Sequence, residues 1–347
     1  MSALQQMLLT GGNKLSSTAM VVAHSTTPFV TAYPWSDIAG FGVKYADPSV
    51  LPTSTCYGAT FTGSNDAVIA SVGSSPYLIA YPWGGSGFGV KYANPSTLPT
   101  GLAYDVNITP ASDAVAFAHA TTPFITAYPW ASSTGFGVKY ANPSTLPVSA
   151  GRGVAFTNDS VVMAQQSTPY VVAYAWSSGS GFGARYTNPG TLPTGIGLGV
   201  AFSLQNDVVA VAHNTSPYIS VYPWTSGSGF GTKYINPVTL PAAGCLGVDF
   251  SSNGTAIAVA VNGSPNITAY PWSFSSGFGA KYTNPATLPT GSGNRVKFSY
   301  AGNALSVAHD TTPFVTAYPW SDIAGFGVKY ADPSVLPTGS GRDLSFN

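Results

Sequence analysis

The sequence predicts an all-β protein, a seven-bladed β-propeller with four antiparallel strands in each blade. Three observations predict this fold: a repeat that recurs seven times in 347 residues, four short strands within each repeat, and one incomplete repeat divided between the two ends of the chain. The composition agrees, because a chain with 39 Gly, 28 Pro and no Glu is a poor helix former. A hydrophobic content of 44% is sufficient for a large core and argues against disorder.

The repeat is marked by tryptophan. Each Trp follows Ala-Tyr-Pro or a near variant, and consecutive Trp residues are 46 to 48 positions apart. A Gly-Phe-Gly, a Lys/Arg-Tyr, an Asn/Asp-Pro and a Leu-Pro then follow in the same order in every copy. A unit of about 47 residues has the size of a propeller blade. The seven tryptophans are Trp35, Trp83, Trp130, Trp176, Trp224, Trp272 and Trp320.

The unit around Trp224 shows the four expected strands. The first covers 199–202 and is followed by an Asn-Asp turn of the kind that hairpins need. The second covers 208–213 and the third 218–222, and both are continuously apolar, which indicates burial on both faces. The fourth covers 230–234. A proline follows each of the last two strands and is expected to end it.

The two ends of the chain predict closure of the ring. Residues 19–24 and 29–33 have the pattern of a second and a third strand, but no first strand precedes them. Residues 341–346 have the pattern of a first strand with no others after it. We expect this C-terminal strand to join the N-terminal three strands, since closure removes the open sheet edges. The predicted organisation is an N-terminal arm (1–18) followed by the propeller (19–347).

The motifs also carry a resemblance. A Gly-Val-Ala-Phe-Ser strand, an Asn-Asp or Asn-Gly turn, an apolar strand and a further strand that ends near Trp resemble WD40-like β-propeller repeats from about residue 19 onward. The chain departs from WD40 proper, because it has no Trp-Asp dipeptide or Gly-His element, and Pro precedes Trp in six copies. Its low-charge, near-identical blades are similar to propellers of bacteriophage genomes. That resemblance implies a structural or interaction role.

Charge and hydropathy exclude several classes of protein. With 12 basic and 12 acidic residues, the formal net charge is zero, so capture of nucleic acid through its phosphates is not expected. The sequence contains no run of about 18 apolar residues, so no membrane helix is predicted. The N-terminus lacks the basic and apolar regions of a signal peptide. Cys56 and Cys245 fall in different blades and are expected to be free thiols, because a disulfide requires Cα atoms within about 7 Å.

No catalytic constellation is expected. The four histidines occupy one repeat position in four different blades, too far apart to share a metal ion. We expect each to be hydrogen-bonded to a loop. No nucleophile–base pair or paired carboxylate is evident, so the prediction is that the protein is not an enzyme and has no cofactor or metal. The four residues are His24, His119, His213 and His309.

Charges on the first strands break the repeat. First strands line the central channel of a propeller, and most of them here carry Gly or Ala. Five charged residues lie on three blades that adjoin at the closure. Two interpretations remain open: a channel-mouth site for a small polar ligand or a partner loop, and an ion-pair network that sets the register of closure. Asp105 and Arg152 are interpreted as isolated. The five candidates are Asp249, Arg295, Lys297, Arg342 and Asp343.

Aromatic and basic residues repeat around the ring. The Tyr two positions before each Trp is expected to fill the wedge between blades. If the Trp rings are exposed at a rim, they would form seven equivalent carbohydrate sites. The Lys or Arg that follows each Gly-Phe-Gly lies on the outermost strand, where it either protects the sheet edge or forms a cationic ring for an anionic polymer.

The resulting functional prediction is a non-enzymatic structural or interaction scaffold, a tail, fibre or decoration protein of a bacteriophage virion. Its partners would be virion proteins, with neither nucleic acid nor a membrane. A multivalent carbohydrate-binding propeller, with glycans as partners, is the alternative. An engineered symmetric propeller is a further alternative, since residues 26–53 and 311–338 are identical.

Overall fold

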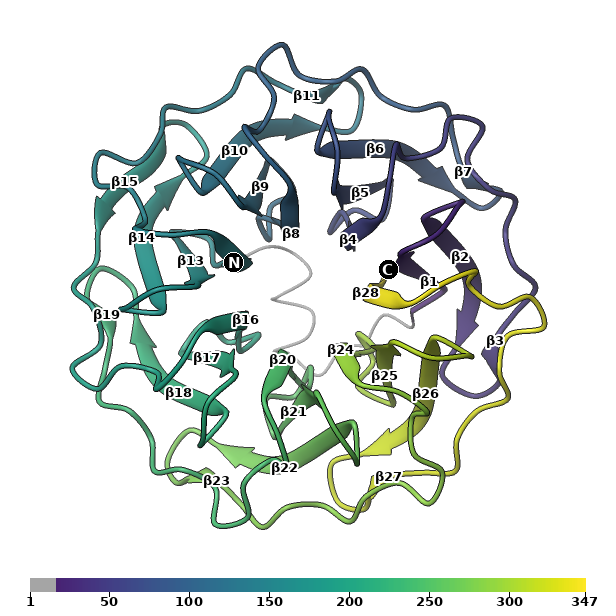
Figure 1. Ribbon diagram of the computed structural model, residues 1–347, viewed down its shortest axis with the longest axis vertical. Coiled ribbons are helices and arrows are strands. Elements are labelled where there is room, and N and C mark those ends of the chain that lie inside the picture. The colour runs from purple at the N-terminus through teal and green to yellow at the C-terminus, as the bar shows by residue number, and fades with distance from the viewer. Residues whose placement is uncertain (1–16) are drawn as a thin grey trace.

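The computed structural model describes residues 17–347, which form seven four-stranded antiparallel sheets in a ring around a central channel (Figure 1). The predicted fold, its seven blades and its mode of closure are confirmed. The predicted arm (1–18) lies outside the described residues except for its last two. Of these, Thr18 already contacts the ring, because its carbonyl accepts a hydrogen bond from the Trp35 amide at 2.8 Å.

Each blade has an inner, a second, a third and an outer strand, counted from the channel. The inner strands are β4 (Cys56–Phe61), β8 (Ala103–Ile108), β12 (Gly151–Phe156), β16 (Gly197–Phe202), β20 (Cys245–Phe250), β24 (Gly293–Phe298) and β28 (Gly341–Phe346). The second strands are β1 (Ala19–His24), β5 (Ala67–Val72), β9 (Ala114–His119), β13 (Ser160–Gln165), β17 (Val208–His213), β21 (Ala256–Val261) and β25 (Ala304–His309).

The third strands cross each blade next to the outer edge. They are β2 (Val30–Ser36), β6 (Leu78–Gly84), β10 (Ile125–Ala131), β14 (Val171–Ser177), β18 (Ile219–Thr225), β22 (Ile267–Ser273) and β26 (Val315–Ser321). The outer strands are β3 (Gly40–Phe41), β7 (Gly87–Phe88), β11 (Gly135–Phe136), β15 (Gly181–Arg185), β19 (Gly229–Phe230), β23 (Gly277–Phe278) and β27 (Gly325–Phe326).

The ring closes where the two ends of the chain meet. Strand β28 pairs antiparallel with β1, with Met20 opposite Phe346, so the first sheet has the order β28-β1-β2-β3. The last residue adds a side-chain clasp, because Asn347 Oδ1 accepts hydrogen bonds from the Thr18 amide at 2.8 Å and from the Ala19 amide at 2.7 Å. Residues more than 300 positions apart thereby complete one blade.

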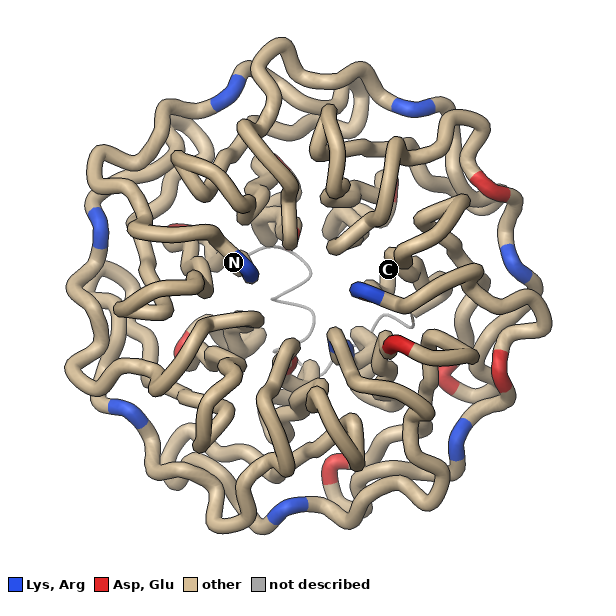
Figure 2. The backbone as a smooth tube through the Cα atoms, in the orientation of Figure 1, with Lys and Arg blue, Asp and Glu red and all other residues tan. Residues whose placement is uncertain are grey.

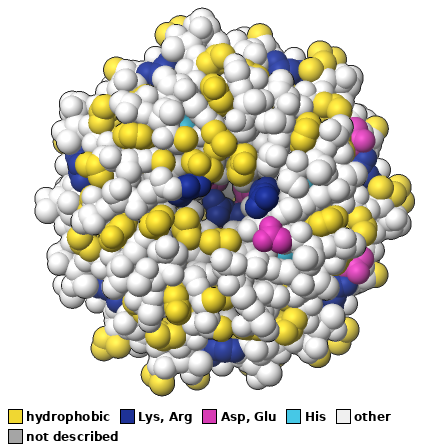
Figure 3. All heavy atoms as spheres, in the orientation of Figure 1, with side chains coloured by type: hydrophobic (Ala, Val, Ile, Leu, Met, Phe, Trp, Pro, Cys, Tyr) yellow, Lys and Arg dark blue, Asp and Glu magenta, His cyan; other side chains and the backbone are white. Residues whose placement is uncertain are grey.

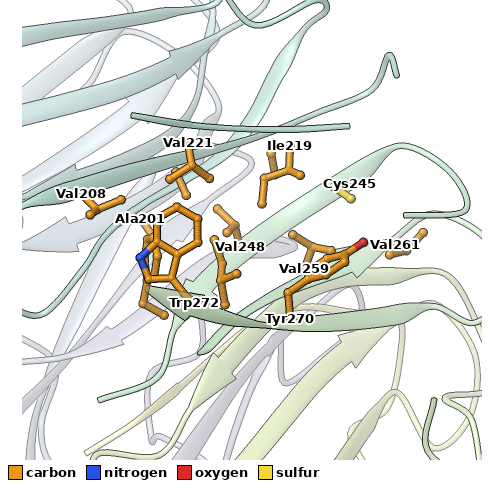
Figure 4. Close-up of a cluster of buried hydrophobic side chains, with 14 residues drawn as sticks. Ala201, Val208, Ile219, Val221, Cys245, Val248, Val259, Val261, Tyr270 and Trp272 are labelled. Atoms are coloured by element: carbon orange, nitrogen blue, oxygen red, sulfur yellow. The ribbon is translucent and has the colours of Figure 1, made fainter. Parts of the chain in front are cut away.

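The core lies between neighbouring blades rather than within one sheet. The second strands are apolar on both faces and fully buried, as the sequence predicts. Figure 4 shows one cluster, in which Ile219 and Val221 of β18 lie opposite Val259 and Tyr270 of the next blade. The Tyr270 hydroxyl donates to the Thr239 carbonyl at 2.8 Å, and the equivalent tyrosine of every blade makes the same bond. The prediction that these tyrosines fill the wedges is confirmed.

The outer strands are shorter than predicted, and the third strands run on through their prolines. The Pro223 carbonyl accepts a hydrogen bond at 2.8 Å from the amide of Gly231, which directly follows the outer strand, but proline has no N–H to return the bond. The ladder therefore ends after two residues. Strand β15 is the exception: Ala175 replaces proline there, and the outer strand continues to Arg185, which pairs with Tyr174.

Candidate functional site

The inner strands supply the wall of the central channel. Each of them pairs with its second strand through a bulge near its beginning, as between Gly151 and Gly153. A bulge redirects the side chain of the extra residue. The second residues of the seven inner strands therefore surround one mouth of the channel, and they are Tyr57, Tyr104, Arg152, Leu198, Leu246, Asn294 and Arg342.

Beyond this mouth the channel widens into a cavity of about 300 Å³. Four of the five predicted charged residues line it, and Arg342 lies instead at the mouth. Asp105, interpreted from the sequence as isolated, also lines the cavity. Figure 2 shows that charged positions occur around the channel as well as on the outer edges of the blades. The charged lining residues are Asp105, Asp249, Arg295, Lys297 and Asp343.

Two of the channel carboxylates join adjacent blades. Asp249 Oδ2 accepts a hydrogen bond from the Phe298 amide at 2.9 Å, and its Oδ1 forms an ion pair with Lys297 Nζ at 3.2 Å. Asp105 Oδ2 accepts one from the Val154 amide at 2.9 Å. Each carboxylate reaches the inner strand of the following blade, so part of the predicted ion-pair network exists. Burial raises the pKa of both aspartates, although neighbouring cations oppose the shift.

Asp343 differs from these two because one of its oxygens is unused. Its Oδ2 accepts a hydrogen bond from the Ala59 amide at 3.0 Å. Its Oδ1 is buried and has no hydrogen-bond partner among the described residues. Burial, together with the negative charge of Asp105, raises the pKa of Asp343 to about 7, while Arg295 and Lys297 oppose the shift. The channel thus holds a carboxyl group that is poised to exchange a proton near neutral pH.

Arg295 lies between the cavity and the arginine-lined mouth, because it lines both. Its Nη1 donates to the Leu246 carbonyl at 2.6 Å, and its Nη2 donates to the Arg152 carbonyl at 3.3 Å. These bonds connect the seventh blade to the sixth and the fourth. Residues far apart along the chain therefore meet in the channel. This explains why sequence spacing alone predicted that Asp105 and Arg152 are isolated from the other charged residues.

The predicted rim of tryptophans does not form. Six of the seven rings are only 4 to 5% exposed, and Trp83 is half-buried. Trp272 packs edge-on against Tyr234 of the preceding blade and against Phe250 and Phe278 of its own. Six of the rings therefore lack the exposure on which the carbohydrate sites depended, because they are part of the core.

The histidines and cysteines are also buried. Nε2 of His119 lies 2.9 Å from Thr126 Oγ1 on the third strand, and the other three histidines have equivalent partners. Cys56 and Cys245 are free thiols, as predicted. Within residues 17–347, no group of three or more His, Cys, Asp or Glu is arranged to hold a metal ion. The same residues include no helix long and apolar enough to cross a membrane.

Comparison with known proteins gives a likeness of structure only. No family model and no curated protein sequence matches the chain. A putative 6-phosphogluconolactonase from Bacteroides fragilis superimposes with a TM-score of 0.74 at 10% identity, covering 97% of this chain and 99% of that one. One from Bacteroides uniformis gives 0.74 at 13%, covering 96% and 100%. A periplasmic gluconolactonase from Pseudomonas aeruginosa gives 0.73 at 15%, covering 94% and 98%.

These comparisons support the propeller fold but neither a WD40 nor a phage type. The prediction of a non-enzymatic virion scaffold is contradicted, because the similar structures bear the names of lactonases. The error has a physical origin. Residues at one repeat position are far apart on the second strands, where the histidines lie, but the inner strands converge on the channel and bring their third and fifth residues together.

Proposed function

We propose that this protein hydrolyses a small lactone, a cyclic ester, in the central cavity. The observation that carries the proposal is the Asp343 carboxyl group, whose unpartnered Oδ1 is buried in the channel wall beside a second carboxylate and two cations. The names of the structural neighbours supply the class of substrate. Hydroxyl and amide groups of Thr60, Asn107 and Ser345 on the same wall are suited to a polyhydroxylated ring.

Each group has a defined part in this reaction. Ionised Asp343 takes a proton from a water molecule as the water oxygen attacks the ester carbonyl carbon. The negative charge that develops on the carbonyl oxygen is stabilised by the cations of Lys297 and Arg295. The bond from the carbonyl carbon to the ring oxygen then breaks, and Asp343 returns the proton to that oxygen. The product is an open-chain hydroxy acid, and the carboxyl group regains its starting state.

The test is to measure acid release from five- and six-membered sugar lactones at constant pH. Wild-type protein should exceed the uncatalysed rate, and the rate should rise with pH to a plateau above about 7, where Asp343 is ionised. Asp343→Asn keeps an oxygen to accept the Ala59 amide but removes the base. It should therefore lower the rate by roughly 10²- to 10⁴-fold.

Asp47→Asn is the matched control, because Asp47 is an exposed carboxylate on the outer edge that pairs with Lys44 at 2.5 Å. Its rate should equal that of the wild type. The proposal fails if no lactone is hydrolysed above the uncatalysed rate, or if Asp343→Asn is as active as Asp47→Asn.

A further inference from the structure

The arrangement of arginines is uneven in this chain. It has only four arginines, and three of them line the narrow mouth of the channel. Figure 3 shows Lys and Arg side chains gathered around the central hollow. The hollow at this mouth has a volume of about 170 Å³. In a chain with only 7% charged residues, three guanidinium groups at one opening are a local concentration of positive charge. They belong to Arg152, Arg295 and Arg342.

Contacts within the protein hold Arg152 and Arg295 in place without an ion pair among residues 17–347, although Asp105 and Asp343 attract Arg295 across the cavity. The Arg152 guanidinium lies over the Tyr104 ring, 3.8 Å from its centroid, and its nitrogens face the Gln166 side-chain amide group. Arg295 donates to the carbonyls of Leu246 and Asn294 at 2.6 and 3.3 Å. All of these partners are neutral. Such contacts orient a guanidinium group without neutralising it.

Arg342 has one acidic neighbour at this mouth. Its Nη1 lies 3.6 Å from Asp310 Oδ1, beyond hydrogen-bond distance. The same oxygen already accepts hydrogen bonds from Asn294 Nδ2 at 2.9 Å and Ser340 Oγ at 2.6 Å. The Nε of Arg342 is buried and has no hydrogen-bond partner among the described residues. A buried donor without an acceptor is costly, so the protein itself leaves the hydrogen-bonding capacity of this guanidinium group incomplete.

We propose that this mouth is a binding site for an oxyanion of the size of phosphate. Asp105 and Asp343 of the cavity offset the charge of Arg295, whereas Arg152 and Arg342 face the mouth with one carboxylate, Asp310, beside them, so the mouth keeps a net positive charge. Guanidinium forks match the oxygens of a phosphate or carboxylate group. The site differs from the lactone cavity and does not depend on the proposed hydrolysis, since an anion can bind here whether or not Asp343 acts as a base. Inorganic phosphate and a phosphoryl or carboxylate group on a larger molecule share the required chemistry.

The direct test is calorimetric titration of the full chain with inorganic phosphate. Binding should occur at one site and weaken as sodium chloride is raised, because the attraction is electrostatic. Arg152→Gln and Arg342→Gln should each lower the affinity roughly tenfold or more, the loss expected for a charge-assisted hydrogen bond. Arg185→Gln is the matched control, because Arg185 lies on the outer strand β15 and bonds to Asn188 at 3.0 Å. It should bind phosphate like the wild type.

A second measurement uses the wild-type protein alone, so it does not depend on how the variants fold. Phenylglyoxal modifies accessible arginines, and phosphate should protect Arg152 and Arg342 from it but not Arg185. A parallel titration with a sugar phosphate that binds more tightly than phosphate would identify the larger molecule as the source of the anion, and equal affinity would identify free phosphate. Absence of binding at 10 mM phosphate, or equal protection of all three arginines, overturns the proposal.

Discussion

The four buried histidines should make the protein sensitive to acid. Each stands at the end of a second strand, is fully buried and bonds through Nε2 to a Thr or Ser hydroxyl. Burial lowers the pKa of each one from 6.5 to about 4, because the charged form loses its hydration there. In the unfolded chain the same groups take up a proton near pH 6.5. Stability is therefore fully present above that pH and is lost as the pH falls toward 4.

The size of the effect follows from these values. At pH 5, a pKa of about 4 in the folded state against 6.5 in the unfolded state costs about 2 kcal/mol per histidine. Four such groups lower the free energy of unfolding by about 7 kcal/mol between pH 7 and pH 5. Asp105, Asp249 and Asp343 act in the opposite direction, because burial raises the pKa of each carboxyl group and so offsets part of this loss. The loss caused by the histidines alone is comparable to the whole stability of many domains.

The assay is urea unfolding at pH 7, 6 and 5, followed by tryptophan fluorescence. The matched variant replaces all four histidines with valine, which blade 6 already carries at this position as Val261. This variant should lose the acid sensitivity and become more stable as the pH falls, because only the aspartates then respond. If the wild type and the variant show the same dependence on pH between 7 and 5, the reasoning is refuted.

Three further outcomes are expected. Asn347→Ala removes the acceptor of two backbone amides at the closure and should lower the free energy of unfolding by about 1 to 3 kcal/mol, and an unchanged urea midpoint would contradict the role of the clasp. Cys56 and Cys245 should not react with a thiol reagent in the native protein but should both react in denaturant, because burial excludes the reagent and raises the pKa of each thiol. Replacing 121–148 by the sequence of 26–53 should leave lactone hydrolysis and phosphate binding unchanged, since no residue of that segment lines either hollow.

Much of the fold could be predicted because the strand pattern of one blade recurs seven times in the sequence. The C-terminal strand was expected over the same residues that form β28, since its Gly-to-Phe pattern matches the inner strand of other blades. The length of the outer strands could not be predicted. It depends on whether the proline of the third strand, which has no N–H, faces the outer strand or the second strand. The backbone of Pro223 faces the outer strand, and only the register of the pairing between β17 and β18 reveals this.

The site was predictable only in part. Asp249, Lys297 and Asp343 were placed together because their blades adjoin at the closure. Asp105 was not, although it stands third in its inner strand as Asp343 does in β28. Counting positions from the first residue of each inner strand would have shown this equivalence. The meeting of Arg295 with the Arg152 carbonyl depends on the diameter of the channel, which no local pattern encodes.

The identical segments 26–53 and 311–338 locate the division between scaffold and site. Each segment forms the third and outer strands of one of two adjoining blades. The inner strands of these two blades, β28 and β24, differ in sequence. The same 28 residues therefore serve two positions in the ring, so this part of a blade is interchangeable. The inner strands are not, because β24 carries Arg295 and Lys297 where β28 carries Asp343 and Ser345. The charges that line the channel differ from blade to blade, and a search for function in such a ring begins where its repeats differ.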